Sequence, residues 1–153
     1  MPATVPFAED LFTSTKDELI HAARLAAGNA SIDSSLVCAV VEQESGWEPC
    51  AIRFEPGFDE RYEKGKISNI TEEIARSMSW GLMQVMGETA RDLGWKSHLG
   101  KLLYPGNGLM VGCAKLRACL EAHGGSVADA LLMYNGGGDP GYPAAVMARM
   151  PNY

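Results

Sequence analysis

Apolar residues recur every three or four positions along most of this chain, and glycines or prolines separate the successive runs. That period is the one expected of α-helices with a single buried face. The first run follows Thr15 and Glu18, which have the spacing of a capping box, and it predicts a helix over about 15–27. Gly28 is expected to end that helix.

The second run is expected to begin after Ser31 or Asp33 and to end before Gly46. It places four aliphatic residues on one stripe of a helix: Leu36, Val37, Val40 and Val41. Continuing this stripe by three or four positions reaches Glu44, which puts a carboxyl on the apolar side near the end of the helix. The same pattern is compatible with a helix that ends one turn earlier and leaves Glu44 on the surface.

A buried Glu44 would have unusual acid–base properties. Burial and the partial negative charge at a helix C-terminus both disfavour the carboxylate, so we expect the pKa of Glu44 to be raised. A carboxyl that stays protonated near neutral pH can act as the general acid in cleavage of a glycosidic bond. Glu42 lies about 200° away around the helix, on the face expected to be wet.

The rest of the chain predicts one irregular excursion and several more helices. Residues 50–69 break the helical pattern with prolines, glycines and charges, and a short hairpin is expected around residues 51–68. Further helices are expected at 71–78, at 88–93, after an Asn107 cap, from Ala130 to Tyr134 after the opening residues Ser126 and Asp129, and from Pro143 onwards. The predicted fold class is therefore mostly α, of the α+β kind, in one domain over residues 1–153 with an extended arm at 1–13.

Composition and charge narrow the range of functions. With 153 residues, 46% of them hydrophobic, the chain has the size of one globular domain. Its formal net charge of −6 argues against binding to nucleic-acid phosphates, and no apolar stretch reaches the roughly 20 residues of a membrane-spanning helix. His21, His98 and His123 are scattered and lack the spacing of metal ligands, so no metal is expected.

The cysteines and the N-terminus bear on where the protein is made. Cys38, Cys50, Cys113 and Cys119 form no Cys-x-x-Cys pair and are expected to be reduced thiols. Cys113 and Cys119 point about 120° apart on one predicted helix, which argues against a disulfide between them. Residues 1–12 carry prolines and acidic residues where the apolar part of a signal peptide would lie, so synthesis in the cytoplasm without a signal peptide is expected.

Three short motifs occur in order along the chain: Glu44-Ser45-Gly46 at a helix end, the run Gly81-Leu82-Met83-Gln84-Val85-Met86 followed by Thr89-Ala90, and Tyr134-Asn135 before glycines. In this order and spacing the sequence resembles the catalytic domain of soluble lytic transglycosylases. Such enzymes have a lysozyme-like helical fold and cut peptidoglycan between N-acetylmuramic acid and N-acetylglucosamine. They consume no water, because the C6 hydroxyl of the muramic acid closes a 1,6-anhydro ring.

The resemblance implies roles for individual residues. Glu44 would be the single acid/base, with Ser45 beside it as an orienting group. Five further residues would lie in the glycan cleft, the last two opposite the acid: Met83, Gln84, Met86, Tyr134 and Asn135. A Gln amide offers donors and an acceptor to an acetamido group, Met fills an apolar subsite, and a Tyr hydroxyl can hold a carboxyl in place. Each of these residue types alone is more typical of a core or an ordinary surface position.

The interval between Glu44 and Gly81 departs from the plain bacterial domain. It is longer, and in this it resembles versions found in bacteriophage proteins. Glu55 in this interval is expected at the cleft edge near Glu44, as a substrate-binding carboxylate whose charge raises the pKa of Glu44 further. A surface ion pair of Glu55 with Arg53 or Arg61 is an equally consistent interpretation.

The leading interpretation is a phage-type lytic transglycosylase that acts as a monomer on peptidoglycan glycan strands. It would need no nucleic acid, membrane insertion or cofactor. We expect it to reach the cell wall of bacteria after release from the cytoplasm, as an endolysin, or as part of a virion. Two alternatives remain: a muramidase, that is a hydrolytic lysozyme, using Glu44 and Glu55 as its two carboxylates, and a non-catalytic wall-binding virion component.

Overall fold

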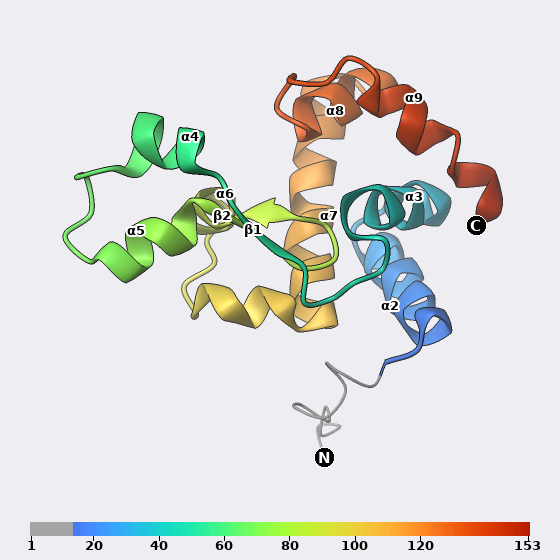
Figure 1. Ribbon diagram of the computed structural model, residues 1–153. Helices are drawn as coiled ribbons and strands as arrows, with labels where there is room; N and C mark the ends of the chain where they lie inside the picture. Colours follow the sequence, from blue (N-terminus) through green and yellow to red (C-terminus); the bar gives the residue numbers. More distant parts are fainter. Residues whose placement is uncertain (1–13) are drawn as a thin grey trace.

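The computed structural model describes residues 14–153, which form a set of helices around one long helix, with a small sheet to one side (Figure 1). The helices are α2 (Lys16–Asn29), α3 (Ser34–Ser45), α4 (Pro56–Phe58), α5 (Ile70–Arg76), α6 (Gly87–Asp92), the long α7 (Pro105–Ala122), α8 (Val127–Tyr134) and α9 (Tyr142–Met147). The strands are β1 (Ile52–Phe54), β2 (Met78–Trp80) and β3 (Val85–Met86). Short π-helical and 3-10 turns lie at Asp59–Glu63, Leu99–Leu103 and Met150–Asn152. The predicted mostly helical fold class is confirmed, whereas the arm predicted at 1–13 lies outside the described residues.

Capping side chains set the starts of four helices, among them Asn69 at α5, which accepts the N–H groups of Thr71 and Glu72. The Thr15 hydroxyl accepts the Glu18 N–H and the Glu18 carboxylate accepts the Thr15 N–H, which completes the predicted capping box of α2. Asp33 accepts two backbone N–H groups at the start of α3, and Ser126 accepts one at the start of α8. These bonds satisfy N–H groups that the first helical turn leaves without partners, so short-range sequence is enough to predict them.

Two helix ends differ from the prediction. Helix α2 continues past Gly28, and the chain leaves it at Ala30 in a right-handed conformation that needs no glycine. Helix α7 begins at Pro105, because proline fits the first turn of a helix, where its missing N–H is not needed. Asn107 therefore lies inside α7, and its side chain donates to the Lys101 carbonyl (3.0 Å) instead of capping the helix.

The sheet joins segments that lie further apart in the sequence than predicted. Strand β1 pairs antiparallel with β2, with Ile52 opposite Trp80, and β2 pairs antiparallel with β3. The hairpin predicted around residues 51–68 is wrong, because the partner of β1 follows α5. Residues 56–63 form helical turns instead, starting at Pro56, whose fixed φ suits the first position of a helix.

Helix α7 connects the helical part of the molecule to the loop that joins β2 and β3. It packs against α2 and α8, and its buried face includes Leu109 and Leu116. Gly112 lies on this face, next to Met83. A Cβ atom at position 112 would lie 2.3 Å from the Met83 sulfur, so only glycine leaves room for the Met83 side chain. The close approach fixes the β2–β3 loop against α7 and so positions the motif around Gln84.

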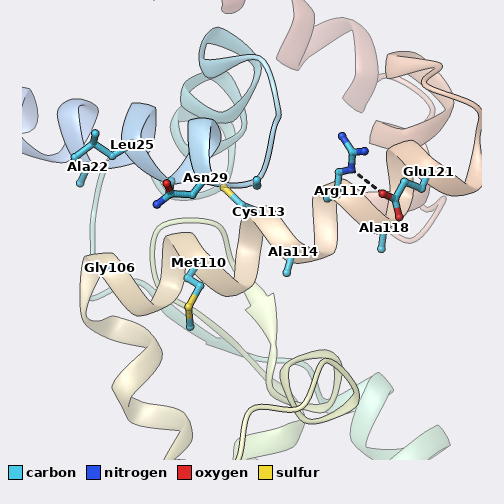
Figure 2. A pocket seen from close by; sticks show the side chains of 12 residues that line it. Ala22, Leu25, Asn29, Gly106, Met110, Cys113, Ala114, Arg117, Ala118 and Glu121 are labelled. Carbon is cyan, nitrogen blue, oxygen red and sulfur yellow. Dashed lines mark hydrogen bonds and ion pairs between the residues drawn. The ribbon is translucent and has the colours of Figure 1, made fainter.

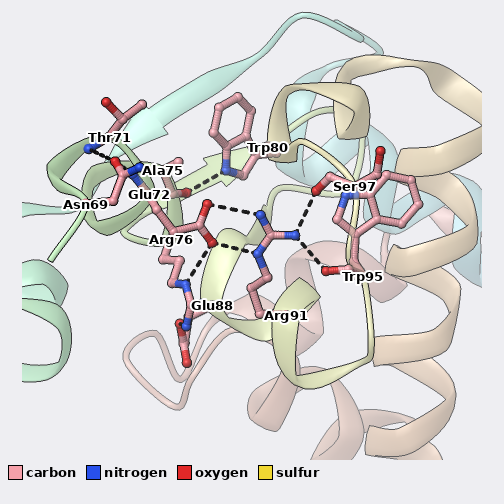
Figure 3. Close-up of polar contacts among 10 residues, drawn as sticks. All are labelled: Asn69, Thr71, Glu72, Ala75, Arg76, Trp80, Glu88, Arg91, Trp95 and Ser97. Carbon is pink, nitrogen blue, oxygen red and sulfur yellow. Dashed lines mark hydrogen bonds and ion pairs between the residues drawn. The ribbon is translucent and has the colours of Figure 1, made fainter. Parts of the chain in front are cut away.

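An ion-pair network joins α5 to α6 and to the segment after α6 (Figure 3). The Arg91 guanidinium donates to both carboxylate oxygens of Glu72, at 2.7 and 3.0 Å, and to two backbone carbonyls beyond α6. Arg76 donates to Glu72 and to Glu88. The hydrogen bonds from Arg91 and Arg76 hold the pKa of Glu72 below its ordinary value. This network orients α6, whose Thr89 faces the cleft described next.

Candidate active site

A cleft of about 630 Å³ lies between the small sheet and the C-terminal helices. This volume is within the range of roughly 300–1,000 Å³ typical of small-molecule sites. Its walls come from α3, β1 and the turns after it, the β2–β3 pair, α6, α7 and α8, and they include Glu44, Arg53, Glu55, Phe58, Tyr62, Ser79, Gln84, Met86, Lys115, Tyr134 and Asn135. The fold therefore brings residues from all three sequence motifs, and from the long interval between the first two, into one cavity.

Glu44 lies in the last turn of α3 and faces this cleft. The helix continues through Ser45 and ends at Gly46, whose left-handed φ of 58° turns the chain away. Burial raises the pKa of Glu44 above its ordinary value, and a hydrogen bond from Tyr142 and the charges of Lys115 and Arg53 offset part of that effect. The prediction of a partly buried carboxyl with a raised pKa is confirmed, and the alternative of a helix that ends one turn earlier is wrong.

Tyr142, and not Tyr134 as predicted, contacts the Glu44 carboxyl. The Tyr142 hydroxyl, at the start of α9, donates to Glu44 Oε1 at 2.5 Å. The Tyr134 ring lines the cleft, but its hydroxyl is buried and donates to the Met83 carbonyl at 2.7 Å. The expectation that Tyr134 holds the Glu44 carboxyl is therefore wrong: Tyr134 fastens α8 to the β2–β3 loop, and Tyr142 orients the acid.

Ser45 and Met83 have structural roles beside the site. The Ser45 hydroxyl donates to the Leu82 carbonyl in the β2–β3 loop at 2.9 Å, and the Val41 carbonyl within α3 lies 3.1 Å from the same hydroxyl. Ser45 is beside Glu44, as predicted, and acts by joining that loop to the helix. The Met83 side chain is fully buried against Gly112, so the expectation that it contacts glycan in the cleft is wrong.

Met86, Asn135 and Gln84 line the cleft, as predicted. Gln84 also has a structural role, because its amide is engaged inside the protein. Its Nε2 donates to the carbonyls of Ala51 and Gly81, both at 2.9 Å, and its Oε1 accepts the Ser79 hydroxyl at 2.8 Å. These bonds hold a residue with a left-handed φ of 46°, a conformation that non-glycine residues seldom adopt.

Replacing Gln84 by Ala should therefore destabilise the protein. The lost amide leaves two carbonyls and a hydroxyl with fewer partners, so the free energy of unfolding should fall by about 1 to 3 kcal/mol in urea titrations. Asn135→Ala, a truncation in the same cleft, is the matched control and should change that free energy by less than about 0.5 kcal/mol. Equal stability of Gln84→Ala and the wild type would mean that the amide is free to bind glycan.

Glu55 lies in the cleft wall, and its carboxylate is paired with a neighbouring arginine. Its carboxylate forms an ion pair with Arg53 (Nε to Oε1, 2.5 Å), and a third of its side chain is exposed (33%). Both sequence interpretations of Glu55, cleft edge and ion pair, are thus met at once. The expected like-charge effect on Glu44 is wrong, because burial raises the pKa of Glu44 while the nearby charges, Lys115 and Arg53, lower it.

Sequence reasoning missed Tyr142 and Lys115. Tyr142 precedes Pro143, which marks the start of a helix, but nothing local separates this tyrosine from any buried aromatic residue. Lys115 carried a usable signal, because it lies three or four positions from Val111, Gly112 and Cys119 and so shares a buried side of α7 with them. A charged residue at such a position is rarely buried without a partner.

A second hollow, of about 700 Å³, lies between α2 and α7 (Figure 2). Small and apolar side chains such as Ala26 and Ala114 line most of it, and its charged residues, Arg117 and Glu121, bind each other at 2.8 Å. Its volume is similar to that of the cleft, and the remaining ionisable group among the described residues that line it is the Cys113 thiol, whose pKa is raised by burial. Across residues 14–153, no three His, Cys, Asp or Glu side chains gather as a metal site requires, and no helix is long and apolar enough to cross a membrane.

The protein thus combines a mostly helical, lysozyme-like fold with a cleft that holds a partly buried carboxyl of raised pKa, Glu44, and a more exposed one paired with arginine, Glu55. The chain belongs to the transglycosylase SLT domain family, whose family model matches residues 21–141. That membership supports lytic transglycosylase activity on peptidoglycan. No curated protein and no solved structure matches the chain.

Proposed function

We propose that this protein cleaves the β-1,4 bond between N-acetylmuramic acid and N-acetylglucosamine and leaves a 1,6-anhydro end. The observation that carries the proposal is the state of Glu44. Its carboxyl is desolvated in a cleft of suitable size, its pKa is raised, and the Tyr142 hydroxyl fixes one of its oxygens at 2.5 Å. A general acid at neutral pH needs this combination of proton retention and fixed position.

In the first step, protonated Glu44 gives its proton to the glycosidic oxygen as the bond from that oxygen to C1 of the muramic acid breaks. The acetamido group of the same sugar stabilises the positive charge at C1. In the second step, the Glu44 carboxylate removes the proton of the C6 hydroxyl while O6 bonds to C1. The glutamate is regenerated, no water is consumed, and one carboxyl serves as acid and then as base.

The surrounding residues suit a bound glycan strand. Met86 offers an apolar surface, and Asn135 offers an amide at the end of α8. Glu55, paired with Arg53, can accept a hydrogen bond from a sugar hydroxyl without attacking carbon. These three residues are the glycan contacts that we retain from the sequence prediction, with Gln84 and Tyr134 supporting the cleft wall.

Mass spectrometry of digested peptidoglycan tests the proposal. Anhydro products and hydrolysed products differ in mass by one water, so the two chemistries are separated in a single experiment. We expect 1,6-anhydromuropeptides from purified walls. A digest that contains only reducing-end muramic acid would reject the anhydro-forming reaction.

The muramidase alternative has one specific observation in its favour, namely that Glu44 and Glu55 line the same cleft. Glu55→Gln decides between the two. Because Glu55 is tied to Arg53 and a third of its side chain is exposed, the substitution should reduce kcat/KM by about tenfold at most and leave the products unchanged. Inactivation equal to that of Glu44→Gln would make Glu55 a second catalytic carboxylate and favour hydrolysis.

For the biological setting, we propose phage lysis or wall penetration by one domain over residues 1–153 that acts as a monomer. The support is the long interval between Glu44 and Gly81, which supplies the helical turns and the Arg53–Glu55 pair on one side of the cleft. Turnover of purified peptidoglycan, once measured, would exclude a purely wall-binding component. Two experiments test these points. Light scattering measures the mass in solution and so tests the monomer. Lysis assays that supply the protein from inside or from outside the cells test the biological setting.

A further inference from the structure

Lys115 places an ammonium group in the cleft that holds Glu44. We propose that Lys115 is a positioning residue that stabilises the negative charge on Glu44 after the acid has given up its proton. This inference rests on the proposed function, since it concerns the state of Glu44 between the two chemical steps. It assigns a role to a residue outside the three sequence motifs.

The geometry shows an ammonium that is fixed in place. Lys115 Nζ donates to the Tyr134 carbonyl at 2.8 Å and lies 3.9 Å from the centre of the Tyr134 ring. That carbonyl belongs to the last residue of α8, where helix carbonyls lack intrahelical partners and carry partial negative charge. Lys115 is itself partly buried, and Val111, Gly112 and Cys119, one turn away on the same face of α7, are buried, so Lys115 is not a fully solvated surface lysine.

Among the described residues, Glu44 is the carboxyl whose charge acts on this ammonium, whereas Glu55, the other carboxyl that lines the cleft, is paired with Arg53. The groups that face it are Glu44 from α3, Tyr134 from α8 and Cys119 from its own helix, with Tyr142 and Arg53 also beside Glu44. Burial raises the pKa values of the Cys119 thiol and of both tyrosine hydroxyls, which therefore stay neutral.

The two charges influence each other in the expected directions. Burial lowers the pKa of Lys115, and the nearby Glu44 carboxylate offsets part of this shift. Lys115 in turn lowers the pKa of Glu44. Once Glu44 has given its proton to the glycosidic oxygen, its carboxylate remains in a cleft that disfavours charge. A fixed cation and the Tyr142 hydroxyl then stabilise the state that the reaction must pass through.

Lys115→Met tests this role, because methionine has a similar length and no charge. We expect kcat on peptidoglycan to fall by about tenfold with KM little changed. The alkaline limb of kcat/KM should move to higher pH, because Glu44 must be protonated to act and loses a cation that favours its carboxylate. Lys115→Arg, which keeps a positive charge, should restore most of the rate and the wild-type limb. Lys101→Met, on an exposed lysine away from the cleft, should match the wild type.

A direct titration separates this inference from the proposed function. The carboxyl ¹³C resonance of Glu44 in glutamate-labelled protein reports its ionisation without any turnover. A Glu44 titration midpoint that is higher in Lys115→Met than in the wild type supports the inference even if the wild type proves inactive, which would reject only the proposed function. An unchanged midpoint and pH limb, with rate and melting temperature falling together, would make Lys115 a purely structural residue and overturn the inference.

Discussion

Replacing Glu44 by Gln is expected to reduce kcat on purified peptidoglycan by about a thousandfold, roughly 4 kcal/mol in the activation barrier. Glutamine has nearly the same shape and its Oε1 can accept the same hydrogen bond from Tyr142, so the fold and the cleft should be retained. What it lacks is the proton that the leaving oxygen needs. The rate should therefore fall while the melting temperature stays close to that of the wild type.

Glu42→Gln is the matched control for this experiment. It makes the same chemical change on the same helix, but Glu42 accepts a hydrogen bond from Tyr153 and does not line the cleft. Its activity should remain within about twofold of the wild type. If Glu44→Gln kept its rate within about tenfold of the wild type, a loss of only 1.4 kcal/mol, Glu44 would not be the acid.

The parts of the fold that could be predicted from the sequence depend on neighbours a few positions apart. Thr15, Asp33 and Ser126 cap helices through bonds to residues two or three positions away. The burial of Glu44 follows from the period of one helix. In each case the partner lies within the same turn or the same helix, so the residue types and their spacing contain the information.

The missed features depend on contacts between distant segments. The pairing of Tyr142 with Glu44 spans 98 residues, and the partner of β1 comes only after α5. In the sequence, Met83 has the character of a flexible apolar residue that contacts a ligand. Its burial depends on Gly112, a residue of another element that leaves space for its side chain. Residue type and spacing do not encode which of two tyrosines reaches the acid, because both are buried aromatics at helix ends, Tyr134 at the end of α8 and Tyr142 at the start of α9.

Tyr142→Phe should lower kcat by about ten- to a hundredfold, since hydrogen bonds to charged groups contribute roughly 1.5 to 3 kcal/mol. The Tyr142 hydroxyl stabilises the Glu44 carboxylate that forms in the first step and fixes its position, and phenylalanine keeps the ring without that bond. The same bond lowers the pKa of Glu44, so its loss should also move the alkaline limb of kcat/KM to higher pH.

Tyr134→Phe removes the same atom from the other tyrosine and should give the opposite pattern. Its hydroxyl donates to the buried Met83 carbonyl, so the variant should lose about 1 to 3 kcal/mol in the free energy of unfolding and retain most of its rate. Steady-state kinetics and urea unfolding of both variants therefore separate the two roles. A loss of turnover in Tyr134→Phe alone, with Tyr142→Phe active, would return the acid-orienting role to Tyr134.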